Sequence, residues 1–480
     1  MTSSQSPLPK ARPLAWACAA MGGTMLVEPA QVCASFLGAA VDSRQVTPGR
    51  LFFALPGERV DGFDFCSGAG QQGAAALVVP SDRGLPTDCA GIPVIAVADV
   101  RRALGDLARA VRAHFKGQVI GVTGSNGKTT TKELIAAALS VGGSVLRTQG
   151  NFNTDVGLPL TVLDATEDET FWVLEMAMRA RGEIAYLADI AKPHVGVVTN
   201  VAGAHLERLG SIDEVARAKG EIFHGLAEGG IAVLPADDPR IEHEASGIAD
   251  ARKLRFGFLN ADPSRCHVRV LDFIPAGESG SVIRLSVEHT PVTVRLPLPG
   301  EHNARNAAAA LAVASACEIP IGAAAARLET ASLPAHRSRL LSVGGRIVMD
   351  DCYNANPTSM RAALTAVAAS VGSGARSFAI LGDMLEIGTD TANQHEALGQ
   401  EVVALKFAGL AAVGELAAHM ANGARSAGLS RQQVVATLDT ELAAAVVADW
   451  SRPGDWILIK ASRGTRLERA LEALQKKLGS

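Results

Sequence analysis

The sequence predicts an α/β protein of three domains. Its 480 residues suggest about three units at roughly 150 residues each. From residue 117 onward, short apolar stretches alternate with segments of helical composition, which is typical of α/β folds. Ala and Gly are abundant, whereas aromatic residues make up 4% of the chain. Small side chains of this kind favour closely packed α/β layers over an all-β domain.

Charge and cysteine usage exclude several classes of protein. The formal net charge is −4, and the charged residues, 20% of the chain, are interspersed without a basic stripe, so we expect no nucleic-acid partner. The seven cysteines are odd in number and contain no C-x-x-C pair. A zinc motif or a disulfide framework is therefore not expected, and a reducing cytoplasm is the natural setting.

The N-terminal segment has two interpretations. Lys10 and Arg12 precede "PLAWACAAM", which is similar to a short export signal. The apolar run is weak, because Pro13 opens it and two glycines follow closely, so we favour a first amphipathic helix. No apolar run approaches the roughly 18 residues that span a membrane, so stable membrane insertion is not expected.

The first domain is expected to cover residues 1–114. The segment 42–55, "DSRQVTPGRLFFAL", mixes turn residues with a strand. Residues 74–79 and 92–99 have the composition of short buried strands, and residues 101–115 have that of a helix.

The central domain is expected to cover residues 115–334 and to resemble P-loop ATPases in fold. Short apolar strands separated by helices predict a parallel sheet that is covered on both faces. Residues 254–299 alternate in polarity, which suggests an antiparallel patch, and an Ala-rich buried helix follows. The strands are expected at 117–124, 170–178, 194–201 and 230–238, and the helices at 130–143, 211–226 and 303–318.

A boundary near Pro334 begins the third domain, residues 335–480. Four apolar strands separated by helices predict a second doubly wound, Rossmann-like α/β unit. These strands are expected at 346–351, 377–383, 409–415 and 456–462.

The stretch 119–133, "VIGVTGSNGKTTTKE", predicts a phosphate-binding loop. The pattern G-x-x-x-x-G-K-[ST] asks for Gly at position 122, where this chain has Val. The context is nevertheless right, because an apolar strand enters the loop and a helix N-terminus, which suits phosphate, leaves it. Lys128 can then reach the outer phosphates of a bound nucleotide, and the Thr129 hydroxyl can bind Mg²⁺. The expected nucleotide-binding residues are Thr123, Gly124, Ser125, Asn126, Gly127, Lys128, Thr129 and Thr130.

Polar residues follow two expected strands at the sheet edge where ligands bind in open α/β sheets. Glu175 follows one strand and Asn200 the next, while His205 and Lys219 come shortly afterwards. A carboxylate and a neutral imidazole beside a triphosphate could hold Mg²⁺. Taken singly, each of these residues also fits a purely structural role.

The loop "VTGSNGKTTTKE" resembles that of the Mur ligases, ATP-dependent amide-forming enzymes of peptidoglycan synthesis. Folylpolyglutamate synthases have a similar loop, so this motif alone indicates only a superfamily. The resemblance implies that Glu175 and His205 bind the metal and that Lys219 is an active-site lysine, which is carbamylated in several members. It further implies that Asn151 and Asn153 of "QGNFNTDVGLPLT" lie near substrate and phosphate. The residues of "GEHNARNAAAALA" that it places near adenine are Asn303 and Asn306.

Segments of the third domain resemble the family member that adds D-alanyl-D-alanine to a UDP-linked tripeptide. "LPAHRSRL" and "MDDCYNANPTSM" match the segments that bring an Arg and an Asp to the nucleotide, here Arg337 and Asp351. Arg339 is an alternative to Arg337. "ILGDMLEIG", with Glu386, is followed by a matching His395, and "IKASRGTRLE" departs from the family pattern at Ala461 and Thr465. The residues that the resemblance implies for substrate binding are Tyr353, Asn354, Asn356, Asp383, Met384, Lys460, Ser462 and Arg463.

The first domain resembles the family's UDP-sugar-binding domain. The resemblance implies that Ser43 and Arg44 contact the diphosphate and uridine, and that Asp61 and Gly62 form the supporting turn. The implied substrates are UDP-N-acetylmuramoyl-tripeptide and D-alanyl-D-alanine, joined by a cytoplasmic, monomeric ligase through an acyl phosphate. The catalytic residues that it implies are Lys128, Glu175, His205, Lys219, Arg337 and Asp351.

Two alternatives remain at this point. One is another amide ligase of the superfamily, such as a folylpolyglutamate synthase, and the other is a non-catalytic ATP-binding scaffold for cell-wall enzymes. The sequence of the first domain and "LGDMLEIG" argue against the former, and the intact set of catalytic residues argues against the latter.

Overall fold

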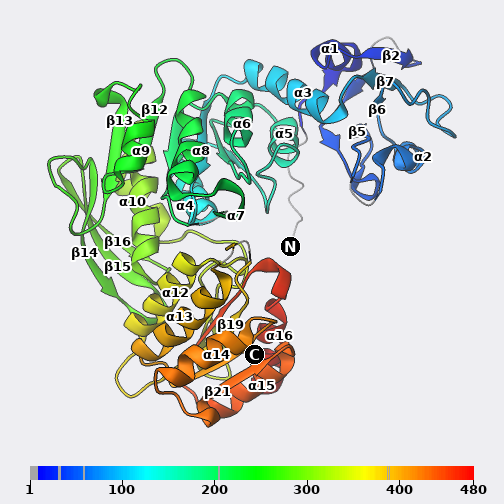
Figure 1. The fold of residues 1–480 in the computed structure, drawn as a ribbon. Coiled ribbons are helices and arrows are strands. Elements are labelled where there is room, and N and C mark those ends of the chain that lie inside the picture. Colours follow the sequence, from blue (N-terminus) through cyan, green and yellow to red (C-terminus); the bar gives the residue numbers. More distant parts are fainter. Residues whose placement is uncertain are drawn as a thin grey trace.

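The computed structural model describes residues 9–30, 34–57, 60–203, 206–385, 387–388 and 390–479. His205 and Glu386 lie outside these ranges. The described chain forms three large β-sheets in sequence order, each flanked by helices (Figure 1). None of the helices in the described ranges has the length and apolar character that crossing a membrane requires.

The first sheet has five strands in the order β2-β7-β6-β5-β4. Only β2 is antiparallel to its neighbour, and a separate two-stranded pairing joins β1 to β3. The expected helix near the N-terminus is present as α1 (Leu14–Ala20), with Leu14 and Ala17 buried. The other elements are β1 (Arg12–Pro13), β2 (Thr24–Val27), β3 (Ser35–Phe36), β4 (Ala39–Ala40), β5 (Leu51–Phe53), α2 (Cys66–Gln71), β6 (Ala76–Pro80) and β7 (Val94–Val97).

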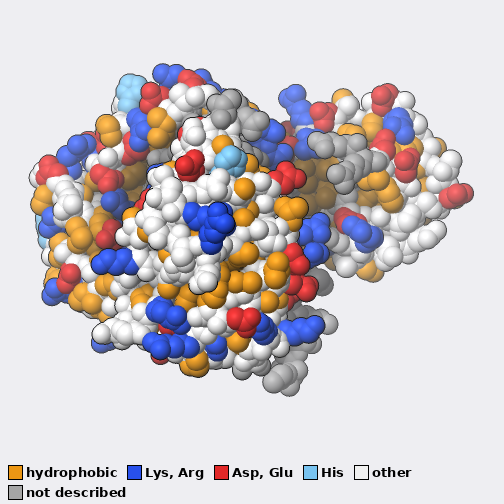
Figure 2. All heavy atoms as spheres, turned by 60° about the horizontal axis from the view of Figure 1, so that its bottom comes forward, with side chains coloured by type: hydrophobic (Ala, Val, Ile, Leu, Met, Phe, Trp, Pro, Cys, Tyr) orange, Lys and Arg blue, Asp and Glu red, His pale blue; other side chains and the backbone are white. Residues whose placement is uncertain are grey.

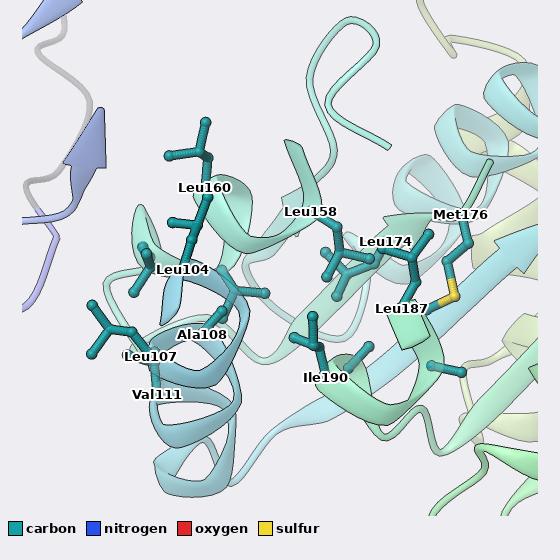
Figure 3. Packing of buried hydrophobic residues seen from close by; sticks show 14 of the residues in the cluster. Leu104, Leu107, Ala108, Val111, Leu158, Leu160, Leu174, Met176, Leu187 and Ile190 are labelled. Atoms are coloured by element: carbon teal, nitrogen blue, oxygen red, sulfur yellow. The ribbon is translucent and has the colours of Figure 1, made fainter. Parts of the chain in front are cut away.

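Helix α3 (Val100–His114) connects the first sheet to the second. Asp99 caps its N-terminus by accepting a hydrogen bond from the Arg102 amide. One face of α3, with Leu104, Leu107 and Val111, packs into a core shared with helices of the central unit (Figure 3). The first sheet is therefore held to the rest of the chain through this helix, and it forms a lobe set off from the main body (Figure 2).

The second sheet has nine strands in the order β16-β15-β14-β13-β12-β11-β8-β10-β9. From β9 to β14 the neighbours are parallel, and β14, β15 and β16 pair antiparallel. The expected antiparallel patch is thus an extension of the parallel sheet, and its first strand, β13, is itself parallel. The strands are β8 (Gln118–Thr123), β9 (Val145–Arg147), β10 (Phe171–Glu175), β11 (Val195–Val198), β12 (Ile231–Pro235), β13 (Lys253–Gly257), β14 (Val268–Pro275), β15 (Ser281–Val287) and β16 (Thr290–Leu296).

Helices cover both faces of this sheet. One core contains residues of α4, α10 and α11, and another contains residues of α3, α5, α6 and α8. Apolar strands such as β11 are buried throughout, as expected for a parallel sheet between two helical layers. The helices are α4 (Lys128–Leu139), α5 (Gly157–Leu163), α6 (Glu183–Ala191), α7 (Leu206–Leu209), α8 (Ile212–His224), α9 (Pro239–Glu244), α10 (Glu301–Ala316) and α11 (Ile321–Leu328).

The third sheet has six strands in the order β17-β18-β22-β19-β20-β21. A hairpin of β17 and β18 lies at one edge, and the remaining neighbours are parallel. Helices α12, α13 and α14 cover one face, and α15 and α16 cover the other. The elements are β17 (Arg339–Val343), β18 (Arg346–Asp350), α12 (Pro357–Ser370), β19 (Ser377–Gly382), α13 (Thr391–Ala404), β20 (Gly409–Val413), α14 (Ala417–Ser426), β21 (Val434–Thr437), α15 (Thr440–Trp450), β22 (Trp456–Lys460) and α16 (Glu468–Leu478).

Candidate active site

A cavity of 1380 Å³ lies where the second and third units meet. It is lined by the start of α4, the ends of β10 and β11, the start of α10 and the loop between β18 and α12. These are strand ends and helix starts, the positions at which open α/β sheets bind ligands. The cavity brings together many of the residues expected from the sequence: Ser125, Asn126, Gly127, Lys128, Thr129, Thr130, Asn151, Asn153, Glu175, Asn303, Asn306, Arg337, Asp351, Tyr353, Asn354, Asn356 and Lys460.

The phosphate loop connects β8 to α4. Val122 is fully buried within β8, so the loop begins only after Thr123. Gly124 and Gly127 have φ angles of 148° and 77°. A Cβ atom on Gly124 would lie 1.9 Å from the Thr199 hydroxyl. The required glycine is therefore at 124, which explains why Val is tolerated at 122.

Residues after β11 hold the loop in shape. The Thr199 hydroxyl donates to the Asn126 carbonyl oxygen at 2.6 Å. The Asn200 side chain donates to the same oxygen at 2.9 Å and accepts from the Asn126 amide at 3.0 Å. Asn200 was recognisable from the sequence as a residue after a strand, but this pairing with the loop was not.

Lys128 reaches back across the loop. Its amino group donates to the carbonyl oxygens of Gly124, at 2.7 Å, and Ser125, at 3.3 Å. Burial lowers the pKa of Lys128, the nearby Glu175 charge opposes this effect, and Arg337 adds to it. Two cations and a carboxylate thus face the same space, an arrangement suited to an anionic ligand.

Glu175 ends β10 and is 2% exposed. One carboxylate oxygen, Oε1, accepts from Asn153 at 2.8 Å. Among the described residues, Oε2 has no hydrogen-bond partner, and its nearest cation is Lys132 at 3.9 Å. A buried carboxylate oxygen left open in this way fits a metal ligand.

Lys219 lies in α8 and is 1% exposed. Burial lowers its pKa well below the ordinary value, and the charge on Lys128 lowers it further. Glu175, Glu183 and Glu221 act in the opposite direction. Lys219 therefore lies close to the phosphate loop and Glu175, although it does not line the cavity. His205, expected as a metal ligand, lies outside the described residues.

The start of α10 forms another wall. Asn303 donates to the Pro299 carbonyl oxygen at 2.8 Å, and Asn306 donates to Asn303 at 3.2 Å. A Cβ atom on Gly127 would lie 2.5 Å from Asn306, so the helix packs directly on the loop. His302 also lines the cavity, and burial lowers the pKa of His302 to about 4, which leaves it neutral at neutral pH.

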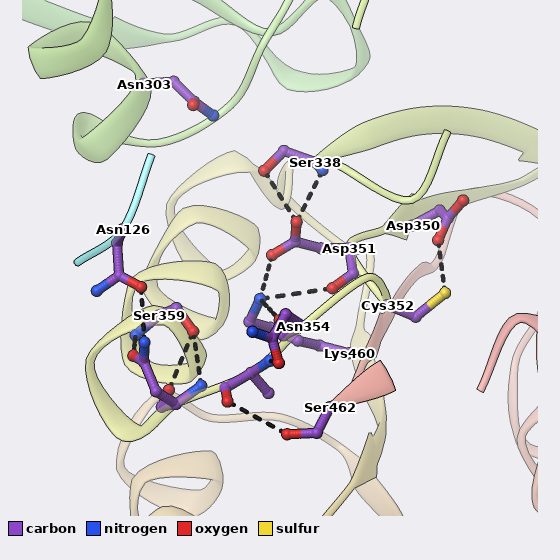
Figure 4. Close-up of polar contacts among 12 residues, drawn as sticks. Asn126, Asn303, Ser338, Asp350, Asp351, Cys352, Asn354, Ser359, Lys460 and Ser462 are labelled. Carbon is purple, nitrogen blue, oxygen red and sulfur yellow. Dashed lines mark hydrogen bonds and ion pairs between the residues drawn. The ribbon is translucent and has the colours of Figure 1, made fainter. Parts of the chain in front are cut away.

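The third unit contributes an ion pair at the ends of β18 and β22 (Figure 4). Lys460 is 2.6 Å from the Asp351 carboxylate and donates to the Asn354 carbonyl oxygen at 3.0 Å. The other oxygen of Asp351 accepts from the Ser338 amide at 2.9 Å. Arg337 directly precedes Ser338, and its guanidinium lies 3.9 Å from the centre of the Tyr353 ring. Arg339, the alternative to Arg337, lies in β17 and does not line the cavity.

A hydrogen bond joins the phosphate loop to the third unit. Asn356 donates to the Asn126 side chain at 2.7 Å. Asn356 also caps α12 by accepting from the Ser359 amide, and the Ser359 hydroxyl completes a capping box. The helix cap of the third unit is therefore in direct contact with the loop.

Other residues expected from the sequence lie outside the cavity lining. Asp383 accepts hydrogen bonds from the amides of Glu415 and Leu416, and the Met384 amide donates to His395. Their side chains are buried within the third unit, where they organise loops beside the sheet. Substrate binding stays a prediction for every residue expected from the sequence, inside or outside the cavity: Ser43, Arg44, Asn151, Asn153, Tyr353, Asn354, Asn356, Asp383, Met384, Lys460, Ser462 and Arg463.

The first unit presents Ser43 and Arg44 on a short 3₁₀ turn, Ser43–Gln45, with Arg44 paired to Asp42. The Asp61 carboxylate accepts from the Phe63 amide and pairs with Arg83. A Cβ atom on Gly62 would lie 2.6 Å from the Leu55 carbonyl oxygen, so the supporting turn has room only for glycine.

Several cavity residues belong to no motif that could be recognised in the sequence. His302 and Arg305 adjoin Asn303 and Asn306, so their helical spacing could have signalled them. The charged residues of α3 that reach the cavity, such as Arg101 and Arg109, carry no local signal, because the packing of α3 against the central unit brings them there.

Family comparisons cover nearly the whole chain. "Mur ligase family, catalytic domain" matches residues 36–112, "Mur ligase middle domain" matches 122–314, and "Mur ligase, glutamate ligase domain" matches 336–463. A protein of Escherichia coli (strain K12) is 36% identical over 442 residues, which is 91% of this chain and 93% of that protein. A protein of Bacillus subtilis (strain 168) is 36% identical over 438 residues, which is again 91% of this chain and 93% of that protein. Both are named UDP-N-acetylmuramoyl-tripeptide–D-alanyl-D-alanine ligase.

Solved structures of MurF match this chain over most of its length. MurF from Acinetobacter baumannii has a TM-score of 0.86 and 29% identity, covering 98% of this chain and all of that one. MurF from Thermotoga maritima in complex with ADP has a TM-score of 0.80 and 31% identity, and the match covers 92% of this chain and 97% of that one. A Mycobacterium tuberculosis folylpolyglutamate synthase, at 18% identity and a TM-score of 0.62, shares only the fold.

Proposed function

Because this chain belongs to the Mur ligase family, we infer that it is the ATP-dependent ligase that adds D-alanyl-D-alanine to UDP-N-acetylmuramoyl-tripeptide. The products are UDP-N-acetylmuramoyl-pentapeptide, ADP and phosphate, in peptidoglycan precursor synthesis. The observation that carries this inference is the cavity between the second and third units. It places Lys128 and the phosphate loop opposite Asp351, Tyr353 and Lys460.

At the ATP end, the chain supplies positive charge and positioning. Amide groups at the start of α4 and the Lys128 amino group face the phosphates, and Asn303 and Asn306 lie toward the adenine. Phosphoryl transfer depends mainly on such positioning and on charge neutralisation. Arg337 adds a second cation from the third unit.

Mg²⁺ fits the residues on this wall. Glu175 offers a buried carboxylate oxygen with no hydrogen-bond partner among the described residues, and Thr129 offers a hydroxyl at the start of α4. When bound, the metal neutralises charge on the transferring phosphate. We propose Thr129, Glu175, His205 and, if carbamylated, Lys219 as its ligands.

The reaction has two steps on the substrates. A carboxylate oxygen of the tripeptide attacks the γ-phosphorus of ATP, ADP leaves, and an acyl phosphate forms. The free amine of D-alanyl-D-alanine then attacks the acyl carbon, and the tetrahedral intermediate collapses to the amide with loss of phosphate and a proton. Water must be excluded while the acyl phosphate exists, so the third unit should stay closed over it.

The third unit is proposed to position the dipeptide. Tyr353, Asn354 and Lys460 line the cavity across from the phosphate loop. The Asp351 carboxylate accepts from both the Lys460 amino group and the Ser338 amide, which ties the segment after Arg337 to the end of β22. The first unit is proposed to hold the uridine diphosphate through Ser43 and Arg44.

We also propose that the enzyme acts as a monomer in the cytoplasm. One chain supplies the phosphate loop, the proposed metal ligands and the third-unit residues. The described cysteines, six in number, are all free thiols, which suits a reducing compartment.

The test is ADP release by the purified protein with ATP, Mg²⁺, UDP-tripeptide and D-alanyl-D-alanine. ADP release should depend on both substrates and should fall at least about a hundredfold in Lys128→Ala, because charge stabilisation of a transferring group is worth that much. Lys116→Ala, an exposed lysine of the central unit, should keep full activity.

Each contrary result favours a different function. Turnover with a folate and glutamate but not with the UDP-tripeptide would favour a folylpolyglutamate synthase. ATP binding without turnover under any of these conditions would favour a scaffold. Full activity in Lys128→Ala would contradict the role of the loop.

A further inference from the structure

Three side chains of metal-binding type meet in the third unit, away from the proposed Mg²⁺ ligands. They are His336, before β17, Asp350, at the end of β18, and Cys352, two residues later. The cluster was not recognisable from the sequence, because His336 lies 14 residues before Asp350 and the three residues form no C-x-x-C or H-x-x-H pattern. The β17–β18 hairpin brings them together.

The three ligand atoms form a triangle of suitable size. The Asp350 Oδ1 atom is 3.2 Å from His336 Nδ1 and 3.0 Å from Cys352 Sγ. The third side, from Cys352 Sγ to His336 Nδ1, is 3.5 Å. Tetrahedral zinc sites have bonds of about 2.0–2.3 Å, which places their ligand atoms about 3.3–3.6 Å apart. Shifts of a few tenths of an ångström would therefore admit the ion above this triangle.

Burial and charge also match a divalent cation. The side chains of Asp350 and Cys352 are 1% exposed, whereas His336 is 27% exposed and leaves one side open to solvent. A carboxylate, a thiolate and a neutral imidazole around a divalent cation have no net charge, so the complete site is neutral where solvation is poor. Soft sulfur and imidazole ligands favour Zn²⁺ over Mg²⁺, which prefers oxygen.

The backbone holds the cluster in place. His336 adopts a left-handed conformation with φ of 65°, and its carbonyl oxygen accepts from the Tyr353 amide at 3.2 Å. His336, which lies on a loop, is thus tied by this hydrogen bond to the segment that carries Asp350 and Cys352. Arg337 and Asp351, which line the cavity, adjoin these ligands in sequence.

We propose that His336, Asp350 and Cys352 form a binding site for Zn²⁺ or a similar borderline-soft divalent cation, distinct from the catalytic Mg²⁺ position. The ligands are imidazole Nδ1, a carboxylate oxygen and the thiolate, and water fills the open side. On binding, the Cys352 S–H bond breaks, a sulfur–metal bond forms, and the proton goes to solvent. No oxidation or reduction occurs. Because the cation binds the folded site, it should also raise the melting temperature of the protein.

The experiment is a Co²⁺ titration of the full-length protein after metal removal with a chelator. Co²⁺ bound to a thiolate gives a sulfur-to-metal charge-transfer band, which oxygen and nitrogen ligands alone do not give. We expect one such band in the unaltered protein, loss of the band on adding equimolar Zn²⁺, and no band in Cys352→Ser. Cys317→Ser, which removes a buried thiol at the end of α10, is the matched control and should keep the band. No band in the unaltered protein, or a band that survives in Cys352→Ser, overturns the proposal.

A second variant tests the proposal even if Cys352→Ser fails to fold. His336→Asn keeps a residue that tolerates the left-handed conformation but removes the imidazole. Zn²⁺ affinity, measured by competition with a chelating dye, should fall at least about tenfold, the lower range of losses seen even for residues behind the ligands. Unchanged affinity in His336→Asn would show that the cluster does not bind the metal.

Discussion

Gly124 lies where the phosphate loop passes closest to Thr199, the residue after β11. Its φ of 148° is rare for residues with a side chain, and the contact distance leaves no room for a Cβ atom. The Thr199 hydroxyl at this point donates to the Asn126 carbonyl oxygen. Gly124 therefore lets the loop pass close to Thr199, and the Thr199 hydroxyl attaches the loop to the neighbouring strand.

Gly124→Ala should destabilise the fold by about 1–3 kcal/mol, because the added methyl group collides with Thr199 in a strained backbone. Chemical denaturation measures this loss. Gly322→Ala is the matched control, since Gly322 lies in α11 with nothing within 4 Å of an added Cβ. It should leave stability unchanged or raise it by up to about 1 kcal/mol. Equal stabilities for the two variants would contradict this account of the loop.

Lys219 is expected to react with CO₂. Burial lowers the pKa of Lys219, which raises the fraction of neutral amine that can attack CO₂ to give a carbamate and release a proton. Protein in ¹³C-bicarbonate should show one carbamate carbon by NMR, and Lys219→Arg should lose it. Lys253→Arg, at another buried lysine, should keep the signal. A signal that persists in Lys219→Arg would assign the carbamate to another amine.

The sequence predicted the polar cavity residues that belong to recognisable motifs, but not the rest of the lining or which way every side chain points. Lys128 begins α4, Glu175 ends β10 and Asn306 lies in the first half of α10, and all three line the cavity, although their roles stay predictions. Asp383 also follows a strand, yet its carboxylate turns to accept amides at 415–416. Motif and strand position alone do not reveal such a competing hydrogen bond.

At the scale of elements, the parallel strands were predictable because they are short, apolar and bounded by helices. The short strands β9 and β21 were not, since a few partly exposed residues carry no clear period. The role of β13 was also missed. Its polarity alternates like that of an edge strand, yet it lies between parallel neighbours.

An ion pair fastens β13 to α9. Arg255 binds Glu242 with two hydrogen bonds of 2.8 Å and holds the pKa of Glu242 at about 2, below the ordinary 4.5. A lowered pKa stabilises the fold fully above pH 4.5 and loses that effect as the pH falls toward 2. The melting temperature of Glu242→Gln should therefore lie below that of the unaltered protein at pH 7, and the gap should shrink toward pH 3.

The control for this pH dependence is Glu228→Gln, at an exposed glutamate of the same unit. Its melting temperature should follow that of the unaltered protein across the same range. A gap for Glu242→Gln that stays constant from pH 7 to pH 3 would show that the ion pair does not couple folding to protonation.

At the scale of the whole molecule, three sheets in sequence order followed from the alternation of strands and helices. Their mutual packing did not, because it depends on surfaces that meet only after each unit has formed. Helix α3 illustrates this, since its apolar face is clear in the sequence but its partners in α5 and α6 are not.

The hydrogen bond from Asn356 to Asn126 should help hold the third unit against the phosphate loop. Asn356→Asp keeps an N-cap for α12 but loses the donor. One net hydrogen bond is worth about 1 kcal/mol, so the KM for ATP should rise about fivefold with little change in melting temperature. Steady-state kinetics measures this rise.

A double-variant cycle with Asn126→Ala separates this contact from other roles of Asn356. If the contact acts as described, the two effects on the KM for ATP should be less than additive. Strict additivity would mean that each residue acts independently.

The cavity draws on residues from Asp99 to Lys460, which has a consequence for biosynthesis. At about 5–20 residues per second, a ribosome needs roughly 20 to 70 seconds to pass from the first of these residues to the last. During that interval the nascent chain carries a phosphate loop without the lysine that completes the opposite wall. Newly made protein can therefore complete this cavity, and begin to join D-alanyl-D-alanine to the tripeptide, only after Lys460 has been translated.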